Sequence, residues 1–146
     1  MTFKHILVPL DNSAASRRTA REAIDFARET GARLTAYHAL SLASGGVYGE
    51  GYRFAHSGEA KEQIRLARER LLQATERAAR AAGVPCDALV ERAAAPGDAI
   101  VAAARKRKCD AIFIGTNGRR GLARLALGSV TSQVIKDAEV PVLVYR

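Results

Sequence analysis

The sequence of 146 residues predicts one α/β domain over residues 1–146, built on an open, parallel, five-stranded sheet with helices on both faces. Three observations predict it. Short apolar runs alternate with stretches of helical periodicity, and the connections between these runs are too long for hairpins. The apolar runs also lack the strict polar alternation of a sheet with one face in water. Both faces of the sheet should therefore be covered.

The first elements form a strand, a helix and a second strand. Residues 3–10 are an apolar run followed by Asp11-Asn12-Ser13, which is typical of a buried strand that leads into a helix start. Apolar residues recur at helical spacing over 14–30, and Gly31 is placed to end that helix. Residues 33–40 then predict the second strand.

The middle of the chain contains a loop and the clearest helical pattern. Residues 41–58 are glycine-rich without periodicity, and a loop of this length in a compact domain is usually functional or mobile. Residues 59–82 predict a helix, which Gly83 ends, and residues 86–92 predict the third strand. The apolar face of that helix is expected at Ile64, Ala67, Leu71, Ala74, Ala78 and Ala82.

The last part repeats the alternation of helix and strand. Pro96-Gly97-Asp98 opens a helix that runs to about residue 107, and residues 110–115 form an apolar fourth strand. A glycine-rich connection follows. A helix at about 129–138 and a strand at 141–145 complete the predicted order of β-α-β-α-β-α-β-α-β.

Composition excludes several classes of protein. With 48% hydrophobic and 26% charged residues, the chain is typical of a soluble globular protein. It has no apolar run of the roughly 20 residues that cross a bilayer, and its first residues lack a signal-peptide cleavage site, so we expect a cytoplasmic protein without a membrane partner. Cys86 and Cys109 form no CxxC motif and the three histidines are scattered, so no metal site is expected.

The net charge of +8 raises the alternative of a nucleic-acid binder. Many arginines, however, alternate with acids along the two longest predicted helices, which favours solvated helix faces. Aromatic residues make up only 5% of the chain, and none is interleaved with a basic cluster as base stacking would require. Nucleic acid is therefore an unlikely partner.

The connection after the fourth predicted strand has the features of a phosphate site. Glycines let backbone N–H groups approach an anion, and Gly128-Ser129 opens a helix whose free N–H groups and positive dipole end attract phosphates. The spacing is neither that of a Walker P-loop nor GxGxxG. The arginines of the same connection are either phosphate ligands or solvated charges: Arg119, Arg120 and Arg124.

On these residues the sequence resembles the universal stress protein family over essentially its whole length. The family's nucleotide-binding signature is a glycine, two residues, a second glycine, nine residues, and a third glycine followed by Ser or Thr. Here it is complete as Gly115, Gly118, Gly128 and Ser129. The VPLDNS, HAL and VPVLVYR segments at the predicted strands also fit the family.

The resemblance implies that ATP binds in a cleft at the carboxyl ends of the strands, in a Rossmann-like sheet of strand order 3-2-1-4-5. The sequence leaves open whether Mg²⁺ accompanies the nucleotide. The adenine would lie near Pro9, Leu10, Asp11 and Ala39, with Asp11 reaching adenine or ribose. The ribose would lie beside Ile114 and Gly115. The phosphates would be held by Gly118, Gly128, Ser129, Val130 and Thr131.

Two of these residues carry an alternative or a departure. Asp11 also suits a turn at a helix start, although Ser13 is the better N-cap candidate. Ala39 replaces the family's usual branched aliphatic residue, which removes packing against the adenine and keeps the backbone hydrogen bonds.

Function is expected to be binding rather than catalysis. No carboxylate or histidine lies between Gly115 and Thr131 to activate water, so no catalytic residue is assigned. We expect an ATP-binding regulatory or sensing module of the stress response. The alternatives are a slow ATPase and an adenylyl-transfer relative on the same fold. The apolar edge strand at 141–145 predicts a homodimer.

Overall fold

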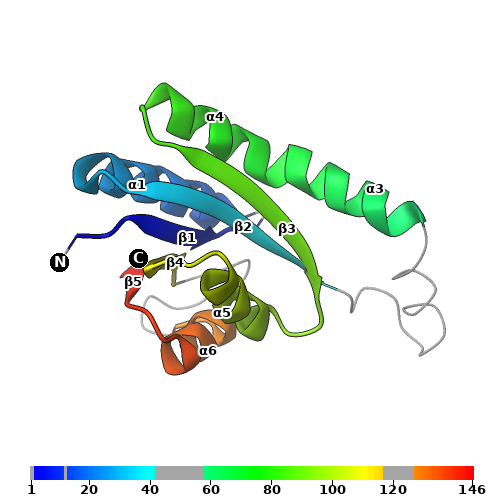
Figure 1. Cartoon of the computed structure of the whole chain (residues 1–146). Coiled ribbons are helices and arrows are strands. Elements are labelled where there is room, and N and C mark those ends of the chain that lie inside the picture. Colours follow the sequence, from blue (N-terminus) through cyan, green and yellow to red (C-terminus); the bar gives the residue numbers. More distant parts are fainter. Residues whose placement is uncertain (1, 12, 42–57, 117–126) are drawn as a thin grey trace.

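The computed structural model describes residues 2–11, 13–41, 58–116 and 127–146 (Figure 1). All five strands in these ranges run parallel in one sheet, in the order β3-β2-β1-β4-β5. They are β1 (His5–Pro9), β2 (Arg33–Ser41), β3 (Cys86–Ala93), β4 (Ala111–Gly115) and β5 (Val142–Tyr145). The fold class and the strand order are those that the sequence predicts.

The helices cover both faces of the sheet. On one face lie α1 (Ala14–Thr30), α3 (Gly58–Ala67), the π-helical segment η1 (Arg68–Leu72) and α4 (Gln73–Ala81). On the other face lie α5 (Pro96–Lys106) and α6 (Ser129–Asp137), as Figure 1 shows. The prediction of helices on both faces is confirmed.

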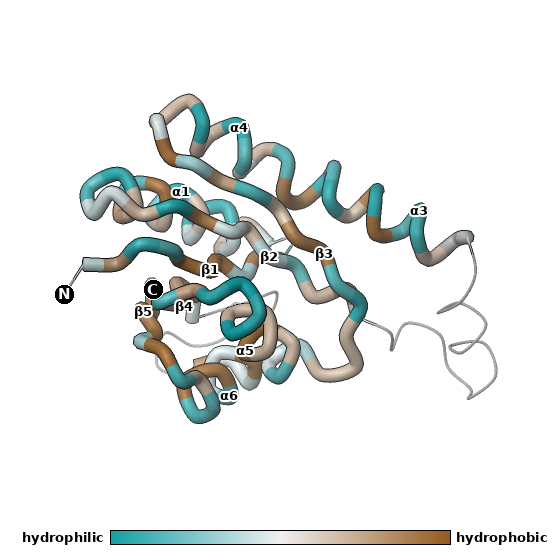
Figure 2. Tube along the Cα trace, in the orientation of Figure 1, coloured by the Kyte–Doolittle hydropathy of each residue, from teal (hydrophilic) through white to brown (hydrophobic). Residues whose placement is uncertain are grey.

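Each face has its own apolar core, because successive residues of a strand point to opposite sides. On β1, Ile6 and Val8 pack in the core beneath α1 and α4. Leu7, between them, packs in the core beneath α5 and α6. β1 and β4 are therefore apolar along nearly their whole length, whereas β2 and β3 also carry polar residues. Figure 2 shows the sheet as brown stretches interrupted by teal.

The ends of α1 follow from local sequence. Ser13 is the N-cap, and its side chain accepts a hydrogen bond from the Ser16 N–H at 3.0 Å. Gly31 ends the helix with a φ of 75°, in the left-handed region that glycine adopts without a steric cost. Both assignments agree with the sequence prediction.

The helix predicted over 59–82 differs from the structure in one respect. The π-helical segment η1 adds a residue to one turn and shifts the buried face that follows it. Ala74 and Ala78, which we expected on the buried face, are exposed. Leu72 and Ala79 are buried instead, each 0% exposed. The spacing could not reveal the shift, because Leu71 and Leu72, like Ala78 and Ala79, are neighbours of equal hydrophobicity.

Three further features bear on the predictions. β5 pairs only with β4 among the described residues, and Val144 in this edge strand is 39% exposed. No helix in the described ranges is long and apolar enough to cross a bilayer. Gly118, the arginines at 119, 120 and 124, and nearly all of the loop predicted over 41–58 lie outside the described residues.

Candidate functional site

A cleft of about 750 Å³ opens at the carboxyl ends of the strands. It lies over β1, β2 and β4. The strand order reverses here, because β2 lies on one side of β1 and β4 on the other. Its volume falls in the range of small-molecule sites. Apart from Gly118, every residue that the sequence assigned to the nucleotide lines it: Pro9, Leu10, Asp11, Ala39, Ile114, Gly115, Gly128, Ser129, Val130 and Thr131.

The first turn of α6 presents backbone donors to this cleft. Gly128 is the N-cap, with φ −61° and ψ 157°, and no side chain caps the helix within the described residues. The first helical hydrogen bond runs from the Ser132 N–H to the Gly128 carbonyl at 2.9 Å. The N–H groups of residues 129–131 therefore have no acceptor within the helix, and the positive end of the helix dipole lies with them. Such a turn is suited to binding an anion.

Gly128 also fits tightly against the end of β4. Its N–H donates to the Thr116 carbonyl at 3.0 Å. A Cβ built on Gly128 would lie 3.3 Å from that carbonyl oxygen and, its chain neighbours apart, would meet no other atom of the described residues within 4 Å. Because Gly128 lines the cleft, a larger side chain would extend into the space that a ligand needs.

Thr131 uses its hydroxyl within the protein. The hydroxyl donates to the Gly115 carbonyl at 2.8 Å and ties α6 to the end of β4. The side chain is only 4% exposed. Because this hydroxyl is engaged, the donor that Thr131 can offer to a phosphate is its backbone N–H.

Gly115 is required by packing. A Cβ at this position would lie 2.5 Å from Thr19 Oγ1. Thr19 is 2% exposed, and its hydroxyl donates to the Ala15 carbonyl at 3.0 Å. The absence of a side chain at Gly115 thus lets α1 approach the end of β4 closely.

Asp11 forms a turn and still has an oxygen to offer. Its Oδ1 accepts the Ser13 N–H at 2.7 Å, and its own N–H donates to Ser16 Oγ at 2.7 Å. The turn role is therefore present. Oδ2 makes no hydrogen bond within the described residues, so the same carboxylate can accept from a ligand.

The cleft also contains residues that the sequence did not assign. Tyr37 and His38 precede Ala39 on β2, and His38 Nδ1 donates to the Leu10 carbonyl at 2.8 Å. Pro96 and Ile100 line it from α5. All four follow from the rule that ligands sit beyond the carboxyl ends of the strands, applied to β2 and to the start of the helix after β3.

The chemistry of the lining favours binding. Asp11 is the one carboxylate among its described residues, and no lysine or arginine is present there. In the described part of the chain, no three His, Cys, Asp or Glu side chains gather to hold a metal ion. The site offers backbone donors, apolar walls and a few fixed polar atoms.

The chain was compared with known families and proteins. Residues 2–146 match the universal stress protein family. A universal stress protein of Methanocaldococcus jannaschii is 34% identical over 145 residues, which cover 99% of this chain and 82% of the relative. A Thermus aquaticus universal stress protein is 32% identical over 144 residues, 99% of each chain.

A solved structure gives a further comparison. The Archaeoglobus fulgidus universal stress protein in complex with dAMP is similar with a TM-score of 0.61 at 27% identity, covering 100% of both chains. Together with the match over residues 2–146, these relatives show that the chain belongs to the universal stress protein family.

Proposed function

We propose that this protein binds an adenine nucleotide, ATP, in the cleft and acts as a regulatory or sensing module. The observation that carries the proposal is the uncapped first turn of α6, whose N–H groups open into the same cavity as Asp11 and Ala39. The dAMP complex of the Archaeoglobus fulgidus relative supports an adenine nucleotide as the ligand class.

The lining divides into two parts that suit the two ends of a nucleotide. The α6 turn holds the phosphates through backbone N–H groups at Ser129, Val130 and Thr131. The carboxyl ends of β1 and β2 receive the nucleoside, where Asp11 Oδ2 accepts from a ribose hydroxyl or a base amino group. Gly118 completes the phosphate site as part of the signature.

A binding role fits this lining better than turnover does. Hydrolysis of ATP uses a positioned base and a metal clamp on the γ-phosphate. Asp11 is the only described lining carboxylate, and its Oδ1 is held in a turn by the Ser13 N–H. A slow ATPase or an adenylyl-transfer relative is the alternative, and multiple-turnover formation of ADP or AMP that an Asp11→Asn change abolishes would favour it.

We also propose that two copies pair through β5. The strand has an unpaired edge among the described residues, and Val144 is 39% exposed there. Exposed apolar edges pair or aggregate, and an antiparallel pairing of two copies closes both edges. Light scattering at micromolar concentration should give twice the monomer mass with nucleotide present, and a monomer mass would contradict the pairing.

Ser129 allows a sharp test of the nucleotide site. Proline is favoured at the first helical position, and Gly128 before it already has the extended conformation that a following proline requires. Ser129→Pro therefore removes one amide donor without breaking the helix. Ser129→Ala, the matched control, removes only the hydroxyl.

Calorimetry with ATP should rank the two variants. One hydroxyl bond is worth about 1 kcal/mol, so Ser129→Ala should bind about 5-fold more weakly than wild type. Ser129→Pro should lose about 10- to 100-fold more, because a donor to an anion is worth more. Equal affinity of the two variants, or a wild-type protein that neither binds ATP nor releases an adenine nucleotide for mass spectrometry, would overturn the proposal.

A further inference from the structure

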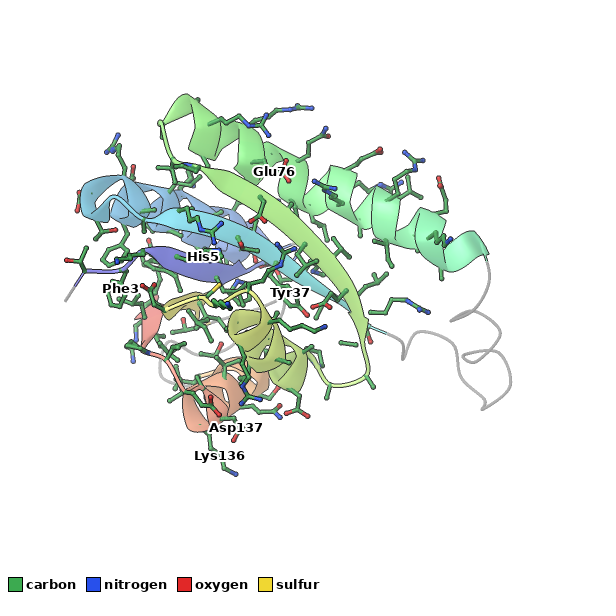
Figure 3. All side chains as sticks on the ribbon, in the orientation of Figure 1. Phe3, His5, Tyr37, Glu76, Lys136 and Asp137 are labelled. Atoms are coloured by element: carbon green, nitrogen blue, oxygen red, sulfur yellow. The ribbon has the colours of Figure 1, made fainter. Side chains whose placement is uncertain are left out.

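The hydrogen-bond ladder between β1 and β2 stops one bond short of where its register would carry it. The odd-numbered residues of β2 point their backbone groups toward β1, as the Arg33 N–H shows by donating to the Lys4 carbonyl at 3.0 Å. The last bond runs from the Leu10 N–H to the carbonyl of Tyr37, which Figure 3 labels, at 2.8 Å. In a parallel ladder the next bond would run from the Ala39 N–H to the Leu10 carbonyl. Between these two described residues that bond is absent.

The side chain of His38 occupies the Leu10 carbonyl instead. Its Nδ1 donates to that oxygen at 2.8 Å, and His38 is only 9% exposed. The ring lies on the α1 face of β2, because alternate residues of a strand share a face and Ala36 packs in the core on that face. The side chain of one residue of β2 thus replaces the backbone N–H of the next residue as the donor to Leu10.

This replacement leaves the Ala39 N–H available in the cleft. Even-numbered residues of β2 face β3, as the Leu34 N–H shows by donating to the Pro85 carbonyl at 2.8 Å. The Ala39 N–H therefore points to the opposite side, where β1 has already ended, and it has no backbone acceptor among the described residues. Ala39 is half-buried and lines the cleft together with Leu10 and His38. Because native proteins pair nearly all backbone N–H groups that are shielded from water, an unpaired one in a cleft wall suits a ligand acceptor.

We propose that His38 is a positioning residue of the nucleotide site: by holding the Leu10 carbonyl, its imidazole keeps the Ala39 N–H free to donate to a ring nitrogen of adenine. The proposal rests on the proposed function, because it requires an adenine nucleotide in the cleft. Without the imidazole donor the Leu10 carbonyl would be left unpaired, and the next donor in register is the Ala39 N–H. The ladder would then gain one bond, and the cleft would lose one donor.

Two substitutions separate the hydrogen-bond donor from the imidazole ring. In His38→Asn the side-chain nitrogen is as many bonds from the backbone as Nδ1 is, so it can still donate to the Leu10 carbonyl. His38→Leu has no donor, and its apolar side chain suits the face that Ala36 shares. A thermal melt checks that both variants fold.

Hydrogen exchange of the Ala39 amide, measured by NMR on the full chain without nucleotide, tests the replacement of one donor by the other. The amide should exchange rapidly in wild type and in His38→Asn. In His38→Leu it should exchange at least about 5-fold more slowly, because it gains the Leu10 carbonyl as an acceptor. The Leu10 amide, which is bonded to Tyr37 in wild type, should be slow in all three proteins. A protected Ala39 amide in wild type, or equal rates in wild type and His38→Leu, would overturn the role of His38.

Calorimetry with two triphosphates tests the contact with the base. Indole riboside triphosphate has a flat bicyclic base like that of ATP, but this base has no ring nitrogen that can accept a hydrogen bond. His38→Leu should bind ATP about 3- to 10-fold more weakly than wild type, and should bind the indole analogue within about 2-fold of wild type. His38→Asn should keep the wild-type preference for ATP. A merely structural role of His38 would weaken both ligands equally.

The outcomes separate the two proposals. If His38→Leu weakens both triphosphates equally, or weakens neither, the role of His38 is overturned and the nucleotide site stands. If wild type binds neither triphosphate, the proposed function is overturned and the role of His38 with it.

Discussion

The two rims of the sheet treat their polar groups in opposite ways. At the amino-end rim, His5 Nε2 donates to Thr35 Oγ1 at 2.8 Å, and Thr35 Oγ1 donates to Asp87 Oδ1 at 2.6 Å. Arg107 completes the chain by donating to Asp87 Oδ2 at 3.1 Å. At the carboxyl-end rim, the first amides of α6 and Asp11 Oδ2 lack such partners among the described residues. The first rim holds the fold together, and the second has free donors and acceptors that suit the nucleotide we propose.

Other groups at the amino-end rim are also paired. The Asp110 carboxylate accepts the N–H groups of Lys4 at 2.8 Å and His5 at 3.0 Å. The basic residues in the last turn of α5 are paired as well: Arg105 lies 2.6 Å from Glu139, and Lys106 lies 3.7 Å from Glu91.

The largest effect is expected from Gly128→Val. Its φ of −61° suits any residue, so the backbone is not strained, but the side chain would press on the Thr116 carbonyl and fill the cleft. ATP affinity should fall about 100-fold or more, with a small loss in melting temperature. Gly58→Val is the control that should bind normally, because a Cβ at this position meets nothing within 4 Å in the described part of the chain. A folded Gly128→Val protein that binds ATP with wild-type affinity would show that the cleft beside Gly128 is not the nucleotide site.

Gly115→Ala should act on stability even though Gly115 lines the cleft. Its Cβ would lie 2.5 Å from Thr19 Oγ1, and such overpacking costs about 1–3 kcal/mol in the free energy of unfolding. Urea unfolding measures it. Adding Thr19→Ala removes the clashing oxygen, so the double variant should be more stable than the sum of the two single changes. Simple additivity would contradict the packing role.

Thr35→Val should weaken the amino-end rim alone. The change removes the hydroxyl that joins His5 to Asp87, and Thr35 is 0% exposed. Leaving a buried donor unpaired costs about 1–3 kcal/mol of unfolding free energy. ATP affinity should stay within about 2-fold of wild type. A parallel loss of ATP affinity would show that the two rims are not separate.

His5 should make stability depend on pH. Burial, and then the neighbouring Arg33, lower the pKa of His5 below its ordinary value of 6.5. Below that pH the unfolded chain takes up the proton before the folded protein does, so unfolding becomes easier as the pH falls. One group contributes at most about 1.4 kcal/mol per pH unit. Urea unfolding from pH 7.5 to 5.0 should show a steeper loss for wild type than for His5→Gln, and parallel curves would exclude His5 as the cause.

The smallest effect is expected from Lys108→Gly. Lys108 has a φ of 54°, in the left-handed region, just after α5. Glycine adopts this conformation without the steric cost of a side chain, so the unfolding free energy should rise by about 0.5–1 kcal/mol. Lys136→Gly, within α6, should lower it by a similar amount. A decrease in both variants would show that Lys108 is not strained.

The fold followed from the sequence because its signals are local. Apolar runs, helical spacing, Ser13 and Gly31 each act within a few residues, and their order along the chain implies a parallel sheet. The shift at η1 was missed because the neighbours Leu71 and Leu72, and likewise Ala78 and Ala79, have the same hydrophobicity. The site was predicted only in part. The signature located the α6 turn, whereas the contact of Gly115 with Thr19 arises between segments far apart in sequence.

The difference between the two rims is tested most directly by NMR titration of the ¹⁵N-labelled full chain with ATP. The account predicts saturable shift changes at the amides of Ser129, Val130 and Thr131, and at those of Asp11 and Ala39. The amides of His5, Thr35 and Asp87 at the amino-end rim should not move. Shifts that are absent from the first turn of α6, or that gather at the amino-end rim, would contradict it.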